Sequence, residues 1–440
     1  MSVPYLNDRA LPPSYYEASA GNRVDYPSLP GNIDCDVCVV GGGLAGLHTA
    51  LNLAEQGARV VLLEANRIGW GASGRNGGHV IAEFACGMQT LEDALGLDAA
   101  LHCWTLARDG ADCVRQRIAA YGIDCDYRSG HIEAAVMPRH LRHLRDWQER
   151  AGRQYDYRYR FIDREEMRQF IGTDRYQGGL LDENGGHLHP LRFALGMAQA
   201  LTAAGGRIFE NSALESWQDG ERVRVRSSGG EVLAKTLVLA CNVGMASIGG
   251  DVPRRLARRI LPVGTWIIAT APLAATLADE LLPTRAAVAD NRVVLDYFRL
   301  SADNRLVFGG GCSYLGEGTP AGFAESLRRG MVKVFPQLAQ TPVEFAWGGV
   351  IDISMSRAPE FARLQGLGAP GNVYYAQGFS GSGLVATAVA GRVLAEAIQG
   401  NRRNLDLFMR LTHLPFPGGA LLRGPLTAAG MLWSRLRDQF

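Results

Sequence analysis

A strand, a glycine-rich turn and a helix are predicted in direct succession near the start of the chain, and this succession constrains the fold more than any other feature. Cys35–Val40 is an apolar, β-branched run that is typical of a strand buried on both faces. Gly41 to Gly46 then has the spacing G-x-G-x-x-G, and residues 44–57 carry apolar side chains at helical spacing. Residues 59–64, RVVLLE, predict a second strand. Such a β-α-β unit predicts a dinucleotide-binding fold, whereas an isolated glycine turn would not.

The chemistry of this unit follows from its bare backbone. A tight glycine turn exposes backbone N–H groups at the N-terminus of a helix, where a pyrophosphate meets the positive end of the helix dipole. Glu64 ends the second strand, where a carboxylate can accept hydrogen bonds from an adenosine ribose and would repel a 2'-phosphate. The predicted nucleotide contacts are Gly41, Gly43, Leu44, Ala45, Gly46, Glu64 and Ala65.

A second glycine-rich loop, ANRIGWGASGRNGGHV, follows Glu64 directly. A bare nicotinamide-binding unit does not need this loop, but the loop can wrap the pyrophosphate and ribityl chain of a longer cofactor, which favours FAD. The alternative is a flexible surface loop. Ser73, Arg75 and Asn76 add hydroxyl, guanidinium and amide donors suited to an anion. The predicted cofactor contacts in this loop are Gly71, Ala72, Ser73, Arg75, Asn76, Gly77 and Gly78.

Two distant segments are predicted to return to the nucleotide sheet. Residues 234–244 are an apolar strand that runs into a turn of small residues. Residues 372–400 predict another strand, another glycine turn and another helix, which starts near Ser382 or Gly383. A helix N-terminus at this place can point at the pyrimidine end of a flavin and stabilise negative charge on the reduced ring. The predicted contacts are Gly378, Gly381, Ser382 and Gly383.

Charge, hydropathy and metal-ligand spacing exclude several other classes. The net charge is +1, so neither nucleic acid nor an anionic membrane is an expected partner. No run of about eighteen apolar residues is free of charge, and the N-terminus does not resemble a secretory signal. We therefore expect a cytoplasmic protein without an integral membrane segment. Cys35 and Cys38 spell C-x-x-C, but residues three apart in a strand point to opposite faces, and no metal site is predicted.

Nearly the whole chain resembles the FAD-dependent amine and amino-acid oxidoreductases of the D-amino-acid oxidase and sarcosine oxidase family. The blocks IGWGASGRNGG and HLPFPGG are more specific to this resemblance than the nucleotide motifs. The full set of matching segments is SYYEASA, DVCVVGGGLAGL, VVLLEANRIGWGASGRNGG, IDCDYRSG, DENGGHLHPL, DYFRLSADNRLVFGGG, QGFSGSGL and HLPFPGGALLRGPL.

The resemblance implies an α/β fold in which a Rossmann-type FAD-binding domain is interleaved with a β-sheet-rich α+β substrate domain. The sequence agrees independently, because residues 292–311 predict a hairpin around SADN and residues 190–206 predict a helix before the strand RIFE. The expected segments are 1–85, 185–250 and 346–440 for the FAD-binding domain, and 86–184 and 251–345 for the substrate-binding domain.

The resemblance also implies the reaction. Noncovalently bound FAD is expected to oxidise the C–N bond of a small-molecule amine, such as a gamma-glutamyl polyamine or a related secondary amine or amino acid, to an imine, with O2 as the acceptor. Ile351 stands where sarcosine oxidases with a covalent flavin have a cysteine, so covalent attachment is not expected. This chemistry requires neither a metal nor a nucleophilic triad. The oligomeric state is not predicted.

The catalytic candidates are His79, Arg75, Tyr297 and Trp347. Arg75 is expected either near the flavin or a substrate carboxylate, or as a buried donor for its own loop. Strand alternation sends only one of Tyr297 and Phe298 into the site. Trp347 and the glycines after it bring a strand against the flavin ring. His79 either titrates near neutral pH and helps to deprotonate the amine, or hydrogen-bonds the cofactor, and we favour the second role.

Three positions depart from the family pattern. His79 stands where relatives commonly have glutamine, Ser382 where they have histidine, and Trp266 where a smaller polar side chain is expected. We expect these three side chains to border the flavin or the substrate.

Two other functions stay open at this stage. One is a dehydrogenase that passes electrons to a quinone, for which residues 426–440 would form an amphipathic helix resting on a membrane. Packing against the rest of the protein is the favoured role of that segment. The other is a flavin-binding module without turnover.

Overall fold

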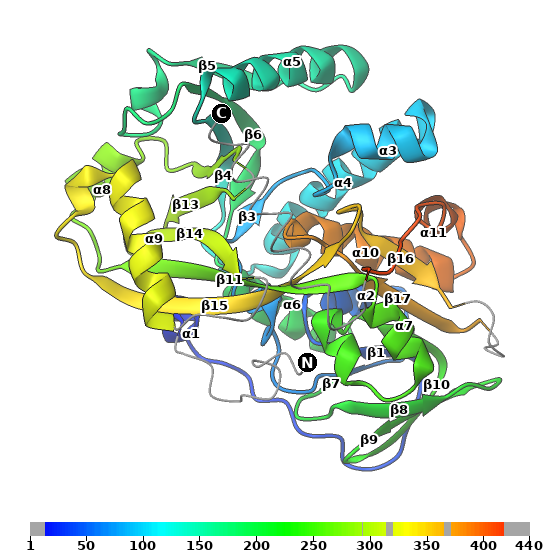
Figure 1. The fold of residues 1–440 in the computed structure, drawn as a ribbon. Helices are drawn as coiled ribbons and strands as arrows, with labels where there is room; N and C mark the ends of the chain where they lie inside the picture. The colour runs from blue at the N-terminus through cyan, green and yellow to red at the C-terminus, as the bar shows by residue number, and fades with distance from the viewer. Residues whose placement is uncertain (1–13, 293, 314–319, 365–370, 418–440) are drawn as a thin grey trace.

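Two β-sheets form the framework of the computed structural model (Figure 1). The structure describes residues 14–292, 294–313, 320–364 and 371–417. The first sheet takes strands from the beginning, the middle and the end of the described chain, and the second sheet takes strands from the segments between them. This architecture confirms the predicted fold class, an α/β nucleotide-binding domain interleaved with a β-sheet-rich domain.

The first sheet is mainly parallel and contains the strands predicted to bind the nucleotide. Its order is β16 (Glu360–Arg363), β17 (Val373–Gln377), β10 (Gly230–Leu239), β1 (Ile33–Val40), β2 (Val60–Leu63) and β7 (Arg207–Phe209). β9 (Val223–Ser227) pairs with β10, and β8 (Leu214–Gln218) pairs with β9. β17, β10, β1, β2 and β7 run parallel. The central strands are buried on both faces, as their continuous apolar runs predict.

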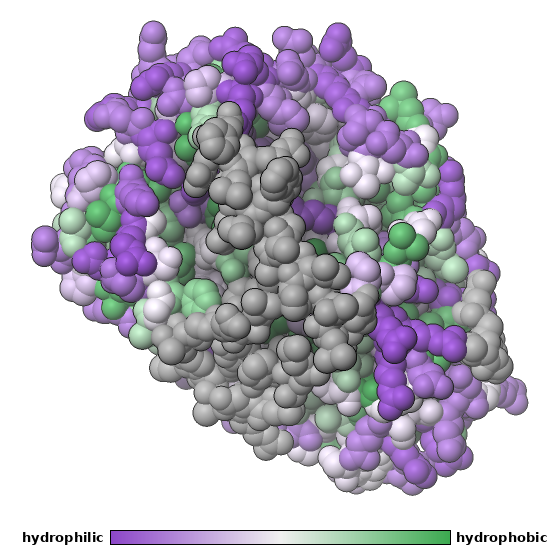
Figure 2. Space-filling model, viewed as in Figure 1, coloured by the Kyte–Doolittle hydropathy of each residue, from purple (hydrophilic) through white to green (hydrophobic). Residues whose placement is uncertain are grey.

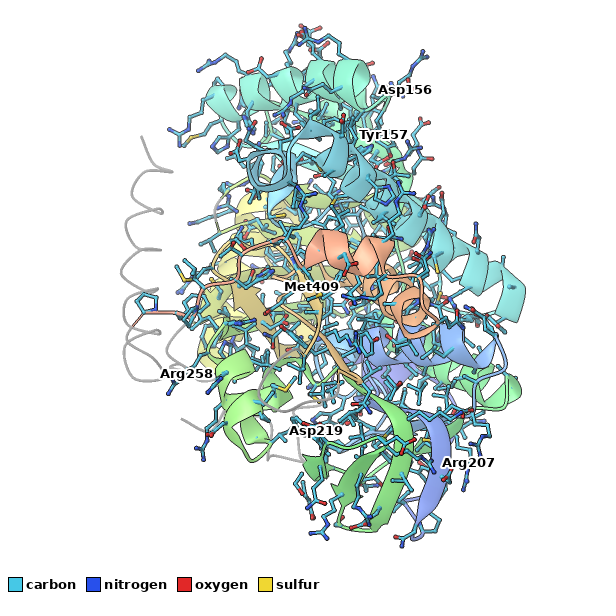
Figure 3. The ribbon with its side chains drawn as sticks, turned by 90° about the vertical axis from the view of Figure 1, so that its right-hand side faces the viewer. Asp156, Tyr157, Arg207, Asp219, Arg258 and Met409 are labelled. Carbon is cyan, nitrogen blue, oxygen red and sulfur yellow. The ribbon has the colours of Figure 1, made fainter. Side chains whose placement is uncertain are left out.

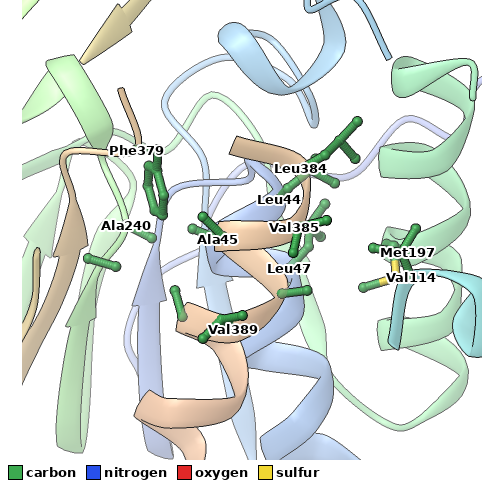
Figure 4. Close-up of a cluster of buried hydrophobic side chains, with 14 of the residues drawn as sticks. Leu44, Ala45, Leu47, Val114, Met197, Ala240, Phe379, Leu384, Val385 and Val389 are labelled. Atoms are coloured by element: carbon green, nitrogen blue, oxygen red, sulfur yellow. The ribbon is translucent and has the colours of Figure 1, made fainter. Parts of the chain in front are cut away.

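Helices cover one face of the first sheet. α2 (Leu44–Ala54) and α10 (Gly383–Ile398) lie side by side (Figure 4), and Gly391 of α10 packs against His48 of α2. α6 (Pro190–Ala203) packs against the other side of α2. α2, α6 and α10 begin within a residue or two of the positions that the sequence predicts.

The prediction that Cys35 and Cys38 point to opposite faces is wrong. Both thiols lie in one hydrophobic cluster on the side of the first sheet that faces β8 and β9. The reason is an irregularity in β1, where the N–H groups of Asp36 and Val37 both donate to the carbonyl of Arg59, at 2.9 and 3.3 Å. The pairing of β1 with β10 keeps one register through this point, so both strands depart from strict alternation together. The two cysteines are nevertheless free thiols.

The second sheet is mixed and contains the predicted hairpin. Its order is β15 (Val343–Ser354), β11 (Ile260–Thr270), β14 (Leu306–Ser313), β13 (Asp296–Leu300), β12 (Ala287–Asp290), β4 (Arg128–Ala135), β6 (Gly178–His187) and β3 (His79–Val80). β5 (Arg160–Asp163) pairs with β6. The SADN turn joins β13 to β14, and the N–H of Asn304 donates to the carbonyl of Ser301 at 3.1 Å. This turn confirms the predicted hairpin.

The two faces of the second sheet have different surroundings. On the outer face, Phe298 and its neighbours form a hydrophobic cluster with α8 (Ala275–Leu281) and α9 (Pro320–Val334). The opposite face, which we call the inner face, meets the core of the first domain. Strand pairing places one row of residues in register across the inner face: Glu133, Ala289, Tyr297, Gly309, Ile267 and Trp347.

The remaining helices extend the two ends of the molecule and its flanks. They are α1 (Tyr15–Ser19), α3 (Gly87–Leu95), α4 (Leu97–Tyr121), α5 (Pro138–Gln154), α7 (Asp251–Ala257) and α11 (Arg403–Phe408). Tyr157 lies near α5 at one end, and Arg207 and Asp219 lie at the other (Figure 3). Figure 2 shows polar side chains gathered over both ends. Within the described residues, no helix has the length and apolarity needed to cross a membrane.

The expected domain boundaries stay a prediction. β15 crosses the expected boundary at residue 346, because most of it lies beyond that residue while it pairs with β11 in the second sheet. The segments 1–13 and 418–440, including the helix predicted at 426–440, lie outside the described residues.

Candidate active site

The first glycine turn leaves no room for side chains at two positions. Gly41 has a φ of +115°, and a Cβ there would lie 2.4 Å from the carbonyl oxygen of Ala240. A Cβ on Gly46 would lie 1.9 Å from the carbonyl oxygen of Gly41. The turn therefore brings β1, β10 and the N-terminus of α2 together at contact distance, which only bare backbone permits.

Glu64 and Ser73 hold this turn in place. The N–H of Gly42 donates to Glu64 Oε2 at 2.6 Å, and the N–H of Asn66 donates to Oε1 at 2.8 Å. The N–H of Leu44 donates to Ser73 Oγ at 2.9 Å. Burial raises the pKa of the Glu64 carboxyl, and the two N–H donors oppose that rise. Glu64 thus fixes the glycine turn through direct hydrogen bonds, and its predicted contact with a ribose stays a prediction.

The second glycine loop folds back on itself. A short 3₁₀ turn, Ala72–Gly74, forms its centre. Asn76 Nδ2 donates to the carbonyls of Ala72 and Ser73 at 2.9 and 3.0 Å, and the N–H of Gly78 donates to Asn76 Oδ1 at 2.8 Å. The Asn76 amide therefore shapes the loop. Ala65 and Gly71 are exposed, so the structure brings them less closely into the cluster than the other predicted contacts.

Arg75 and Trp347 join this loop to the second sheet. Arg75 Nε donates to the carbonyl of Gly348 at 2.8 Å, and Trp347 Nε1 donates to the carbonyl of Arg75 at 3.1 Å. Both side chains are buried. Because these bonds cross from the glycine loop to β15, they fix the position of one domain relative to the other.

A third glycine turn precedes α10 and depends on an acid that the sequence analysis missed. Asp352 of β15 accepts a hydrogen bond from the N–H of Gly378 through its carboxylate, and its backbone carbonyl accepts one from the N–H of Ser380 at 2.9 Å. Asp352 is buried, and burial raises its pKa to about 7. Ser382 is the N-cap residue of α10, and its hydroxyl donates to the carbonyl of Glu83 at 3.1 Å.

His79 lies where the second loop enters the second sheet. Its ring centroid is 5.5 Å from that of Tyr297 and 5.3 Å from that of His131. Its Nε2 is buried and has no hydrogen-bond partner in the described structure. Burial, together with His131, Arg299 and His187, holds the pKa of His79 well below its usual value. This direction favours a neutral ring at neutral pH, and the two roles expected for His79 stay predictions.

Tyr297 packs edge to face against the ring of His79. A Cβ on Gly77 would lie 2.7 Å from its ring. Phe298, the next residue, is fully buried in the outer cluster. The strand therefore sends only Tyr297 toward the glycine loop, as alternation predicts. Arg299, which the sequence analysis missed, donates from Nε to the carbonyl of Gly77 at 2.7 Å and from a terminal nitrogen to the Tyr16 hydroxyl at 3.1 Å.

The inner face also carries acids that no motif indicated. Glu133 lies in the same row as Tyr297, with Ala289 between them. Glu83, which follows β3, accepts a hydrogen bond from the Tyr159 hydroxyl at 2.7 Å. The only signal in the sequence is a charge at an alternating position of an apolar strand, HIEAAV for Glu133.

The expectation that Trp266 borders the flavin or substrate is wrong. Its side chain lies in the outer cluster and stacks on Phe323 of α9, with ring centroids 4.7 Å apart. Trp266 pairs with Gly348 in the continuous register of β11 with β15, next to the pair of Ile267 with Trp347, so alternation places its side chain on the face opposite Trp347. Within the described residues, no group of three or more His, Cys, Asp or Glu side chains could hold a metal ion.

The turn before α2 fits a flavin dinucleotide. The backbone N–H groups of Gly43, Ala45 and Gly46 hydrogen-bond to no other described backbone group, and they lie at the positive end of the α2 dipole. These are the groups that would hold a diphosphate. Asp352 holds the third turn, and this turn precedes the N-terminus of α10, which could stabilise negative charge on a reduced flavin.

Comparisons with known proteins agree with this geometry. The family model described as "FAD dependent oxidoreductase" (DAO) matches residues 36–397. Gamma-glutamylputrescine oxidoreductase of Escherichia coli (strain K12) is 41% identical to this chain, over 97% of this chain and 98% of that protein.

Solved structures show the same fold. Glycine oxidase from Geobacillus kaustophilus superposes with a TM-score of 0.70 at 18% identity, over 83% of this chain and 95% of that chain. L-proline dehydrogenase from P.horikoshii superposes with a TM-score of 0.69 at 18% identity, over 86% of this chain and 96% of that chain. This chain belongs to the DAO family of FAD-dependent oxidoreductases, as its sequence motifs predict, and FAD is its cofactor.

Proposed function

We propose that this enzyme oxidises the amine carbon of gamma-glutamylputrescine or of a closely related amine. The amine R–CH2–NH2 and O2 give the imine R–CH=NH and H2O2, and water then hydrolyses the imine to an aldehyde and ammonia. Bound FAD accepts the hydride equivalents that leave the carbon beside the nitrogen. The observation that carries this proposal is the 41% identity, over 97% of the chain, to a protein named for oxidoreduction of gamma-glutamylputrescine.

The chain's own residues are proposed to orient the amine. Tyr297 and Trp347 provide aromatic walls on the inner face, and Arg75 and Trp347 lock the glycine loop to that face. His79 has a buried Nε2 without a partner beside Tyr297, so it offers one hydrogen bond to the cofactor or to the substrate nitrogen. Holding the neutral amine in a near-attack geometry and excluding water are the main tasks left to the protein.

FAD is proposed to be bound without a covalent link. Ile351 packs against the third glycine turn, since a Cβ on Gly381 would lie 3.6 Å from its Cδ1. A side chain without a nucleophile therefore occupies the position of the linking cysteine in covalently flavinylated relatives. Acid precipitation of the purified protein should release all of the yellow colour into the supernatant, and colour that stays in the pellet would contradict this assignment.

An anaerobic substrate screen tests the reaction. Gamma-glutamylputrescine, putrescine, pipecolate, sarcosine and D-amino acids are mixed with the purified protein while the flavin band is followed. We expect gamma-glutamylputrescine to bleach the flavin fastest. A flavin that no amine bleaches would favour a binding module without turnover.

A second measurement identifies the electron acceptor. Admitting air to the reduced enzyme should produce one H2O2 for each amine oxidised. Slow reoxidation in air with rapid reoxidation by a soluble quinone would instead favour the dehydrogenase alternative. A cytoplasmic location belongs to the same proposal, and cell fractionation tests it.

A further inference from the structure

Glu83 lies close enough to Glu133 in the interior to raise the pKa of the Glu133 carboxyl. The charged neighbour that acts on Glu133 is Glu83, and the charged neighbour that acts on Glu83 is Asp182. Glu133 makes no hydrogen bond or ion pair with the other described residues, although it is only partly accessible. Buried carboxylates are normally paired with a cation or with several donors, because an unpaired charge is costly in a low dielectric. The described residues therefore supply no hydrogen-bond or ion-pair partner for the Glu133 carboxyl.

The other acids of this region are better satisfied than Glu133. Asp182 Oδ1 accepts hydrogen bonds from the Tyr157 hydroxyl and from the N–H of Asn184, the second at 3.0 Å. Glu83 accepts one from Tyr159. Burial raises the pKa of Glu133 to about 7, and the Glu83 carboxyl adds to that rise. An ammonium group beside Glu133 would oppose this rise and favour the charged carboxylate.

An unpartnered buried histidine gives an independent indication of a ligand. His131 is 6% exposed, and its Nε2 has no hydrogen-bond partner in the described structure. It lies two residues before Glu133 on the same strand and hence on the same face. Its ring also meets the ring of His79. A polar atom so deeply buried normally has a hydrogen-bond partner, and a ligand at this place could supply one to His131 Nε2.

The position of Glu133 defines which part of a substrate it meets. Tyr297, Ala289 and Glu133 are in register on three neighbouring strands. Two strand spacings separate Tyr297 from Glu133, which is about 10 Å. Ala289, between them, carries only a methyl side chain. A substrate oxidised beside His79 and Tyr297 would therefore reach Glu133 with a group several bonds away from the oxidised carbon.

We propose that Glu133 and Glu83 bind a second ammonium group of the substrate, remote from the carbon that is oxidised. This inference rests on the proposed amine oxidation and narrows its substrate class. The enzyme prefers amines that carry a second cation about 10 Å from the oxidised carbon, which is the distance of two strand spacings between Tyr297 and Glu133. For gamma-glutamylputrescine this cation is the α-ammonium of the glutamyl group. Small amines with a single nitrogen, such as sarcosine, do not span the two sites.

The test compares two substrates that differ only in the remote ammonium. Gamma-glutamylputrescine and N-glutarylputrescine, which lacks the α-amino group, are used to reduce the flavin of the holoenzyme anaerobically. The apparent Kd and the limiting rate of reduction are measured for wild type, Glu133→Gln, Glu83→Gln and the control Glu183→Gln, which removes an exposed acid on neighbouring β6. Flavin content and Tm are measured for each variant, so that loss of folding is seen directly.

Wild type should bind the glutaryl compound about 10- to 100-fold more weakly than gamma-glutamylputrescine, the range expected for a buried charge pair. Glu133→Gln and Glu83→Gln should weaken binding of gamma-glutamylputrescine by a similar factor, leave the glutaryl compound within about 3-fold, and leave the limiting rate nearly unchanged. Glu183→Gln should match wild type.

The outcomes separate this inference from the proposed function. If wild type oxidises both compounds with equal apparent Kd, the ammonium subsite is wrong while amine oxidation stands, and this result does not depend on any variant. If the variants weaken both compounds equally, the carboxyl groups have a structural role and the inference also fails. If no amine reduces the wild-type flavin, the proposed function itself fails, and the subsite falls with it.

Discussion

The glycine turn before α2 and the inner face of the second sheet meet at one site but are built in opposite ways. At the turn, the side chains of Glu64 and Ser73 are engaged with backbone N–H groups, and the packing leaves no space for a Cβ at Gly46. On the inner face, the ring nitrogens Nε2 of His79 and His131 are buried without partners. The side chains that hold the cofactor end of the site are thus satisfied by the protein itself and leave backbone N–H groups open, whereas the substrate end has side-chain polar groups without partners. We infer that backbone shape selects the cofactor and that side-chain chemistry selects the substrate.

The largest expected effect is on the backbone side. Gly46→Ala places a Cβ 1.9 Å from the carbonyl oxygen of Gly41, a contact that the turn relieves only by moving. We expect a loss of several kcal/mol in stability and protein that retains almost no FAD. Absorbance of flavin per mole of purified protein and the thermal midpoint measure both effects.

The matched control is Gly152→Ala, an exposed glycine in α5 whose Cβ would meet only an ordinary contact at 3.9 Å. This variant should keep its flavin and gain up to about 1 kcal/mol from helix propensity. A Gly46→Ala protein with normal flavin content would show that the turn can move to accept a Cβ. It would contradict the inference that the backbone shape of this turn selects the cofactor.

The second effect concerns the acid that holds the turn. Glu64→Arg removes the acceptor of two backbone N–H groups and places a cation beside the donors of Gly42 and Asn66. Two charge-assisted hydrogen bonds are lost, so FAD affinity should fall by about 100-fold or more. Equilibrium dialysis of the apoprotein with FAD measures it. Glu64→Gln, which keeps one acceptor oxygen, should fall between wild type and Glu64→Arg, and undiminished FAD binding in both variants would remove Glu64 from the cofactor site.

The same contrast explains what the sequence could predict. The turn from Gly41 to Gly46 and the strand and helix around it are consecutive, so local spacing and periodicity predict them. The hairpin at SADN and the start of α10 after Ser382 are equally local and are confirmed. Backbone geometry near in sequence is the part that residue patterns encode directly.

The inner face depends on pairings between distant strands, and the sequence predicted Tyr297 and Trp347 there but missed Glu133. Glu133 and Tyr297 share a row only because β4, β12 and β13 pair in one register. Trp266 was expected at the site from the family pattern, whereas the pairing of β11 with β15 places it on the outer face. Cys35 and Cys38 were misplaced because β1 departs from strict alternation at Asp36 and Val37. Irregular registers follow from three-dimensional packing, so alternation alone does not predict them.

A third prediction concerns the pH dependence of stability that arises from Asp352, a buried acid with hydrogen-bond donors. Asp352 accepts the N–H of Gly378, yet burial raises its pKa to about 7. A carboxyl with a raised folded-state pKa stabilises the fold fully below its usual pKa of about 4, and this contribution is lost as pH rises toward 7. Asp352→Asn keeps an acceptor oxygen and removes the titration.

The stability difference between Asp352→Asn and wild type should therefore grow in favour of the variant from pH 4 to pH 7, by up to about 4 kcal/mol for a shift of this size, and then level off. Urea unfolding at four pH values measures the difference. A difference that is constant with pH would mean that Asp352 has the same pKa in the folded and the unfolded protein. The N–H donors of the third turn would then stabilise the charged carboxylate as much as burial destabilises it.

The smallest expected effect is on the substrate side, at His79. Its pKa lies well below the usual value because of burial and the neighbouring His131, Arg299 and His187, so the ring is neutral above about pH 6.5 in both the folded and the unfolded protein.

If His79 only donates or accepts one hydrogen bond, His79→Gln preserves that ability. The limiting rate of flavin reduction should then fall by less than about 10-fold, the factor that one net hydrogen bond represents. A positioned general base would contribute about 100-fold or more, and its loss would also remove a limb from the pH profile. Reduction by gamma-glutamylputrescine between pH 5 and 9 distinguishes these roles, with His143→Gln on the exposed surface of α5 as the control. An unchanged profile with a small loss places His79 among the groups that orient the substrate or the flavin, and a lost limb would show that the imidazole accepts the proton of the amine.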